Sequence, residues 1–183
     1  DTFNHRIQKF NAEGGVIKVW GGFGTVVDGD SSVGLLNEPW GIAVSEDGYV
    51  YVADRENQRI QIFNPQGQYE HQWINMAKPC GLYISNHRTQ LCYVGELGAA
   101  ISANEGAPGL GPRVSIYDLQ GNVLARLGDT GPGNIPGRFL APHGISVDSY
   151  GDIYVGEVSW TSVGSKLTPP KELRSLQKLI NLT

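Results

Sequence analysis

A segment that recurs along the chain constrains the fold more than any other feature. PWGIAVSEDGYVYVAD (39–54), PCGLYISNHRTQLCYVGE (79–96) and PHGISVDSYGDIYVGE (142–157) align almost residue for residue, and each begins with Pro-x-Gly. A Gly-, Pro- and Ala-rich insertion at 97–112 separates the second copy from the third. Repeats with a period of about 40 residues are single supersecondary units that bury their faces by stacking on one another.

Each copy predicts two short antiparallel strands joined by a tight turn. In the first copy Ile42 and Val44, and then Val50 and Val52, alternate with more polar neighbours, as residues of half-buried strands do. Gly48 provides the positive φ that a tight hairpin requires. We therefore expect two strands in each copy.

A second pair of strands follows the first pair. It reads RIQIFNPQGQYEHQW at 59–73 and RVSIYDLQGNVLARLG at 113–128, and RIQKFNAEGGVIKVWG at 6–21 is an earlier copy. Radial stacking of such four-stranded sheets gives a β-propeller, so we predict an all-β fold. The pattern resembles the NHL repeat, a family of propellers that usually have six blades, and VADRENQRIQIFNPQGQY (52–69) is close to its consensus.

We expect a single domain over 1–183, built as about three four-stranded blades of a partial six-bladed propeller. Its expected parts are an outer half blade at 1–21, a blade at 39–73, a blade at 79–127 with the insertion 97–112, and a last blade with the tail at 142–183. An open row of blades exposes strand edges to water. Either the chain is a piece of a longer protein, or two chains pair as a homodimer that completes the propeller.

The tail, TPPKELRSLQKLINLT, allows two interpretations. Its leucines recur at helical spacing, whereas SLQKLI echoes RIQKF, the third strand of a blade. We predict a short helical turn at 170–174 followed by a strand. The insertion 97–112 is long enough to be a functional lid or contact loop.

Loops that lead into the innermost strands of a propeller gather around its axis, where ligands bind. The residue between Pro and Gly differs among the copies, since it is Trp40, Cys80 or His143. Trp40 beside Arg55 suits a carboxylate-bearing or aromatic ligand, or a peptide. We therefore predict a ligand-binding site formed by Arg55, Trp40, Cys80 and His143.

The same stretches resemble the peptidyl-α-hydroxyglycine α-amidating lyases, through HGI (143–145) and VADRENQRIQIF (52–63). The similarity covers most of residues 1–157 and matches the C-terminal half of that family's catalytic core, a six-bladed propeller that holds zinc and calcium. It implies that His143 is a metal ligand for zinc and that Arg55 contacts a substrate carboxylate.

Three departures from that family concern its chemistry. Trp40 stands where the family has a second zinc histidine, Phe3 where it has the catalytic tyrosine, and Gly144 where it has a calcium ligand. A catalytic zinc site takes three protein ligands, so one imidazole does not make such a site. The resemblance therefore implies a shared fold and pocket position, and zinc or calcium as cofactor only if further ligands are present.

An acidic residue ends the second strand of each unit, and these residues are Asp1, Asp54, Glu96 and Glu157. They form either a ring of carboxylates that binds a cation or a structural pair with the arginine five residues later. Asp1 with Arg6 and Asp54 with Arg59 share this spacing, which favours the structural pair. Arg55 has Thr2 as its counterpart and is therefore the arginine expected to act in function.

Composition restricts the partners. The formal net charge is −4 and the basic residues are scattered, whereas a nucleic-acid binder needs a basic stripe, so we expect no nucleic acid. We expect no membrane contact, because no apolar run approaches the roughly 18–20 residues of a membrane span. Cys80 and Cys92 are expected to be free, mostly buried thiols.

Three functional hypotheses follow, and the acidic net charge opposes one of them, an RNA-binding NHL module. The first is a propeller segment that binds a small-molecule or peptide ligand or another protein, without enzymatic activity of its own. The second is a metal-dependent lyase or hydrolase related to the amidating lyases, which would need the missing blades.

Overall fold

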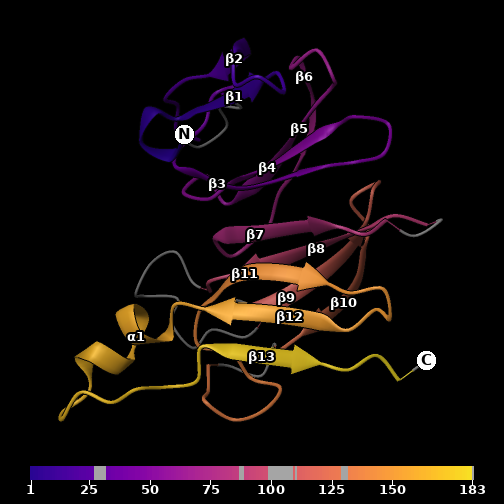
Figure 1. Cartoon of the computed structure of the whole chain (residues 1–183). Helices are drawn as coiled ribbons and strands as arrows, with labels where there is room; N and C mark the ends of the chain where they lie inside the picture. The colour runs from indigo at the N-terminus through magenta and orange to yellow at the C-terminus, as the bar shows by residue number, and fades with distance from the viewer. Residues whose placement is uncertain (27–31, 87–88, 99–108, 110, 129–131, 183) are drawn as a thin grey trace.

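The computed structural model describes residues 1–183 apart from 27–31, 87–88, 99–108, 110, 129–131 and 183. Four antiparallel sheets make up the described part of the chain (Figure 1), and no described helix is long and apolar enough to cross a membrane. The strands are β1 (Arg6–Phe10), β2 (Val16–Gly21), β3 (Pro39–Val44), β4 (Val50–Asp54), β5 (Arg59–Phe63), β6 (Tyr69–Trp73), β7 (Pro79–Ile84), β8 (Leu91–Glu96), β9 (Arg113–Asp118), β10 (Val123–Leu127), β11 (Pro142–Val147), β12 (Ile153–Glu157) and β13 (Leu176–Leu179). The helical turns are η1 (Thr2–Asn4), α1 (Ser159–Ser162) and η3 (Gly164–Lys166).

Each sheet follows the chain as a meander. The strand orders are β1-β2, β3-β4-β5-β6, β7-β8-β9-β10 and β11-β12-β13. The first strands β3, β7 and β11 are neighbours in space, so successive sheets stack along these strands (Figure 1). The predicted all-β class and the four-stranded repeat are confirmed, and the sheets are arranged as the blades of a β-propeller.

The glycine of Pro-x-Gly allows neighbouring sheets to approach. A Cβ on Gly81 would lie 2.5 Å from the carbonyl oxygen of His143 and 3.0 Å from the amide nitrogen of Ile145, and a Cβ on Gly41 would meet the carbonyl of Cys80. Only glycine therefore fits at these two positions without a shift of backbone. A Cβ on Gly144, the third copy, would meet no described atom within 4 Å.

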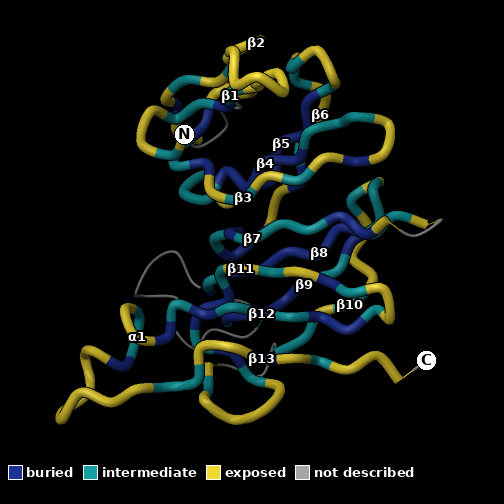
Figure 2. The backbone as a smooth tube through the Cα atoms, viewed as in Figure 1, coloured by how far each residue is buried: buried dark blue, intermediate teal, exposed yellow. Residues whose placement is uncertain are grey.

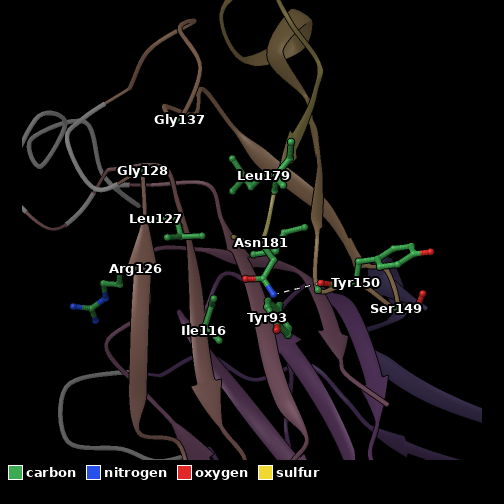
Figure 3. A pocket seen from close by; sticks show the side chains of 13 residues that line it. Tyr93, Ile116, Arg126, Leu127, Gly128, Gly137, Ser149, Tyr150, Leu179 and Asn181 are labelled. Carbon is green, nitrogen blue, oxygen red and sulfur yellow. Dashed lines mark hydrogen bonds between the residues drawn. The ribbon is translucent and has the colours of Figure 1, made fainter. Parts of the chain in front are cut away.

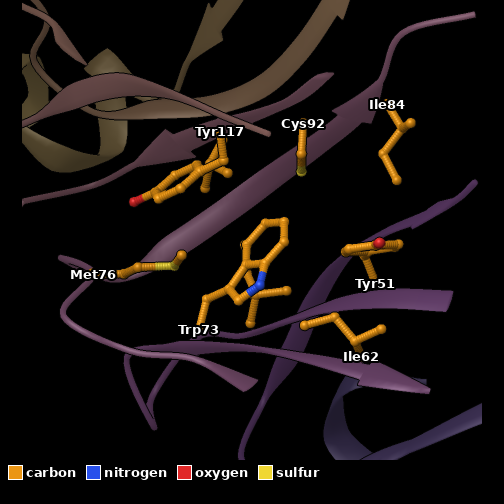
Figure 4. Packing of buried hydrophobic residues seen from close by; sticks show 9 residues of the cluster. Tyr51, Ile62, Trp73, Met76, Ile84, Cys92 and Tyr117 are labelled. Carbon is orange, nitrogen blue, oxygen red and sulfur yellow. The ribbon is translucent and has the colours of Figure 1, made fainter. Parts of the chain in front are cut away.

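Apolar side chains fill the spaces between the sheets, and Figure 2 shows β4, β5 and β8 as largely buried. Between the sheets β3–β6 and β7–β10, the Trp73 ring stacks on Tyr117 with 5.4 Å between ring centroids and lies 5.4 Å from the Tyr51 ring (Figure 4). Cys92 belongs to this cluster and Cys80 is also buried, and both thiols are free, as predicted. This packing fixes the first strands that carry the candidate site.

The acidic residues that end the second strands are structural. The Asp54 carboxylate accepts hydrogen bonds from Arg59 Nε at 2.7 Å, from Asn57 Nδ2 at 2.9 Å and from the amide of Asn37 at 2.6 Å. Asp1 accepts from Arg6 Nε at 2.8 Å. The predicted pairing of the carboxylate with the arginine five residues later is confirmed in both copies.

The other two sheets build the same bond with different residues. Arg113 donates to Glu96, with 2.8 Å between Nη2 and Oε2, although the insertion separates the two residues in sequence. In the last sheet Gln177 Nε2 donates to Glu157 Oε1 at 2.9 Å, because Ser175 stands where the other sheets have arginine. Each carboxylate therefore joins the second strand to the third.

The tail matches the prediction in part. Residues 176–179 form β13, which pairs with β12 as the predicted strand. The predicted helical turn at 170–174 is wrong, because the helical turns lie earlier, in α1 and η3. The Arg174 amide, which would close a turn over 170–174, donates instead to Asn134 Oδ1 at 3.2 Å.

Candidate functional site

The four predicted site residues lie together, where β3, β7 and β11 begin. We call Trp40, Arg55, Cys80 and His143 the mouth cluster. The guanidinium carbon of Arg55 is 4.3 Å from the Trp40 ring centroid, a cation–π contact. The His143 ring stands edge-on to Trp40, with 5.1 Å between centroids and 86° between planes. The four residues of the cluster thus come from three sheets.

Trp40 is the most accessible member of the cluster. It retains 38% of its exposure, whereas Cys80 is fully buried. A partly exposed aromatic side chain can contact a partner at a low cost in conformational entropy. Trp40 is therefore the residue of this cluster that a partner can cover.

Three charged residues that the sequence analysis missed surround Arg55. Arg55 forms ion pairs with Glu38 and with Glu56, the latter at 2.9 Å between Nε and Oε1. Lys78 Nζ lies 3.0 Å from Glu56 Oε2. Two cations and two carboxylates therefore balance one another, and a ligand carboxylate at Arg55 would compete with Glu38 and Glu56.

A sequence signal for two of these residues exists. Glu38 and Lys78 each precede the proline of a Pro-x-Gly segment, so they occupy equivalent positions with opposite charge. Both adopt positive φ, 49° and 54°, which holds them at the same place in the turn. Comparing the residue before the proline among the copies would have identified this pair.

The titration of Cys80 and His143 follows from burial. Burial raises the pKa of the Cys80 thiol to about 12, and the nearby Arg55 guanidinium opposes that rise only in part. Burial and the Arg55 charge lower the pKa of His143 below its usual value. At neutral pH the cluster therefore presents a protonated thiol and a neutral imidazole, and Cys80 is not a thiolate nucleophile.

The described residues do not bring metal ligands together. Within them no three groups from His, Cys, Asp and Glu lie close enough to hold a metal ion. The Arg55 charge beside His143 also disfavours a cation there. The predicted zinc or calcium stays a prediction, as does the resemblance to the amidating lyases. Most of the insertion 97–112 lies outside the described residues.

Sequence comparison gives a repeat family for the centre of the chain. Residues 36–63 match the family model of the NHL repeat. The match includes two residues of the mouth cluster, Trp40 and Arg55. The chain therefore carries an NHL repeat, as predicted.

Two curated relatives illustrate the similarity. The E3 ubiquitin-protein ligase TRIM71 of Rattus norvegicus is 49% identical over 49 residues, which are 27% of this chain and 5% of TRIM71. Protein brain tumor of Drosophila melanogaster is 30% identical over 129 residues, 68% of this chain and 11% of that protein. The chain thus matches a small part of each relative's length.

Solved structures resemble the fold. A streptogramin B lyase structure aligns with a TM-score of 0.55 and 14% identity, over 100% of this chain and 50% of that chain. A protein of unknown function from Bacteroides caccae aligns with a TM-score of 0.60 and 12% identity, over 96% of this chain and 55% of that chain. At these identities the likeness concerns the fold alone.

Proposed function

We propose that the chain is a protein-binding propeller module whose mouth cluster contacts a peptide segment of a partner. The observation that carries this proposal is a contrast within the repeat. The frame around each Pro-x-Gly is nearly constant, whereas the residue between Pro and Gly changes from Trp40 to Cys80 to His143. Residues that differ within a constant frame are free to serve recognition.

The chemistry of the cluster restricts the segment. The exposed part of the Trp40 indole suits an aromatic or apolar side chain. The site has two positive and two negative side chains, which are Arg55, Lys78, Glu38 and Glu56. It therefore favours a peptide without net charge that carries both basic and acidic residues. We therefore expect a segment of mixed charge with an apolar residue on Trp40.

Selection from a phage-displayed library of random linear peptides tests this proposal. Enriched peptides are then measured by isothermal titration against the wild type, Trp40→Ala and Arg55→Ala. We expect each substitution to weaken binding by about tenfold or more, equivalent to about 1.4 kcal/mol. Trp160→Ala is the matched control, because Trp160 is similarly exposed but lies on α1.

Two outcomes contradict the proposal. Equal affinity for the wild type, Trp40→Ala and Arg55→Ala places the peptide elsewhere. Binding of poly(U) RNA at moderate salt without any enriched peptide makes the module an RNA binder. The RNA measurement also tests the exclusion of nucleic acid, which depends on the net charge and on the scatter of the basic residues.

We also propose that a second copy covers the two open ends of the row of sheets. On β7, Leu82 and Ile84 pack on the preceding sheet, whereas Ile42 and Val44, their equivalents on β3, are exposed. At the other end the Gly144 position faces open space. Light scattering at micromolar concentration is expected to give twice the 19.8 kDa of one chain, and a monomer contradicts this pairing.

A further inference from the structure

A groove away from the mouth cluster lies between the sheets β7–β10 and β11–β13. It has a volume of about 740 Å³, and Figure 3 shows Leu127, Leu179 and Asn181 directed into it while Arg126 points away. Its apolar wall consists of Tyr93, Ile116, Leu127, Ile153, Leu179 and Ile180.

The repeat explains why this groove exists. At the same place between the preceding sheets, Trp73 at the end of β6 stacks on Tyr117 of β9. The strand registers make Leu127 the equivalent of Trp73, since Trp73 pairs with Ile60 and Leu127 with Val114. Leu179 likewise takes the place of Tyr117, since Leu179 pairs with Ile153 of β12 as Tyr117 pairs with Cys92 of β8. Two aliphatic side chains thus stand where two aromatic rings fill the other interface.

A third copy of this contact shows that an aromatic ring is the usual occupant. Trp20 of β2 packs on Phe63 of β5 with 6.1 Å between ring centroids. Gly67 lies against the Trp20 ring and Gly121 against the Trp73 ring, where an added Cβ would come within 3.0 Å and 2.6 Å. Indole therefore fits this interface closely in two of its three copies.

The open edge of β13 borders the groove. Among the described strands β13 pairs only with β12, whereas β5 and β9 each have a fourth strand on their outer side. Unpaired backbone amides and carbonyls of an edge strand are a template for an added strand. An extended segment along β13 would place alternate side chains toward the groove, because strand side chains alternate between faces.

From these contacts we propose a second binding site, in which an extended peptide pairs with the free edge of β13 and inserts an aromatic side chain of indole size into the groove. The inserted ring occupies the space that Trp73 fills between the neighbouring sheets. Binding at this site is independent of the mouth cluster, so an experiment can contradict this site without contradicting the proposed function, and the reverse.

The probes are N-acetyl-tryptophanamide and the capped peptide Val-Thr-Trp-Thr-Val, with N-acetyl-alaninamide as the negative control. Binding is followed by the NMR methyl signals of Ile116, Leu127 and Leu179. We expect saturable shifts with both tryptophan probes and none with the alanine probe. The peptide should bind about tenfold more tightly than the single residue, because it adds backbone hydrogen bonds to β13.

Reciprocal substitutions supply the control within the chain. Leu127→Trp fills the groove, so it should weaken both probes by about tenfold or more and raise Tm by about 2–4 °C. Trp73→Leu should open an equivalent groove between the preceding sheets, so the tryptophan probes should shift a second set of methyl signals, from residues near Tyr117. Leu179→Tyr is a second groove-filling variant if Leu127→Trp does not fold.

The outcomes that overturn the proposal are distinct. Absence of saturable shifts in the wild type, or unchanged affinity in both groove-filling variants, removes the aromatic site. Equal affinity of the peptide and the single residue removes the added strand. Loss of binding in Trp40→Ala would assign the probes to the mouth cluster instead.

Discussion

Two copies of one ion pair behave differently because their neighbours differ. Asp54–Arg59 and Asp1–Arg6 have the same spacing and nearly the same length, 2.7 and 2.8 Å. The side chains of Arg59 and Asp54 are 1% and 0% exposed, whereas those of Arg6 and Asp1 are 40% and 27% exposed. The local sequence sets the bond, and the segment before β3 adds contacts around Asp54–Arg59, since Arg59 Nη2 donates to the carbonyl oxygens of Ser32 and Leu35 at 2.9 and 3.0 Å.

The largest difference is expected from removing the two arginines in turn. Arg59→Ala leaves Asp54 buried without its cation, so it should lower the free energy of unfolding by about 3–5 kcal/mol. Arg6→Ala should cost at most about 1 kcal/mol, because water already solvates that pair. Urea unfolding of both variants measures the contrast, and equal losses would show that burial does not determine the strength of the pair.

The glycines of the repeat give an intermediate difference. Gly81→Ala forces a Cβ against the β11 backbone, and we expect it to cost about 1–3 kcal/mol. Gly144→Ala meets no described atom, so its effect should stay within about 0.5 kcal/mol. Thermal unfolding at low concentration compares them. A strong loss in Gly144→Ala alone would contradict an open position there.

Much of the fold could be predicted from the sequence because the repeat is periodic. Equivalent positions in stacked units lie side by side, which is why Trp40, Cys80 and His143 were found as neighbours before their distances were known. The charge partners Glu38 and Lys78 were missed because their contacts join distant parts of the chain. Glu38 lies before the β3–β4 hairpin and meets Arg55 after it, and the Lys78 contact with Glu56 crosses from one unit to the next. The groove was missed because it exists where Leu127 replaces the tryptophan that the equivalent position, Trp73, has in the preceding sheet.

The smallest expected effect is a pH dependence in the mouth cluster. The pKa of His143 is lowered in the folded protein, so the unfolded chain binds more protons just below the usual pKa of 6.5. The free energy of unfolding should therefore fall as the pH falls from 6.5 to the lowered pKa, and His143→Gln should lose that part of the decrease. Identical pH profiles for the wild type and the variant would contradict the burial of a neutral imidazole.

Whether the mouth cluster is the contact surface is tested most directly by the indole N–H signals of the four tryptophans. Trp20 and Trp73 lie between sheets, Trp160 lies on α1, and Trp40 alone belongs to the mouth cluster. When an enriched, unlabelled peptide is added to isotope-labelled protein, the Trp40 signal should shift in a saturable way while the other three stay in place. A saturable shift of Trp160 with an unchanged Trp40 would contradict the proposed function.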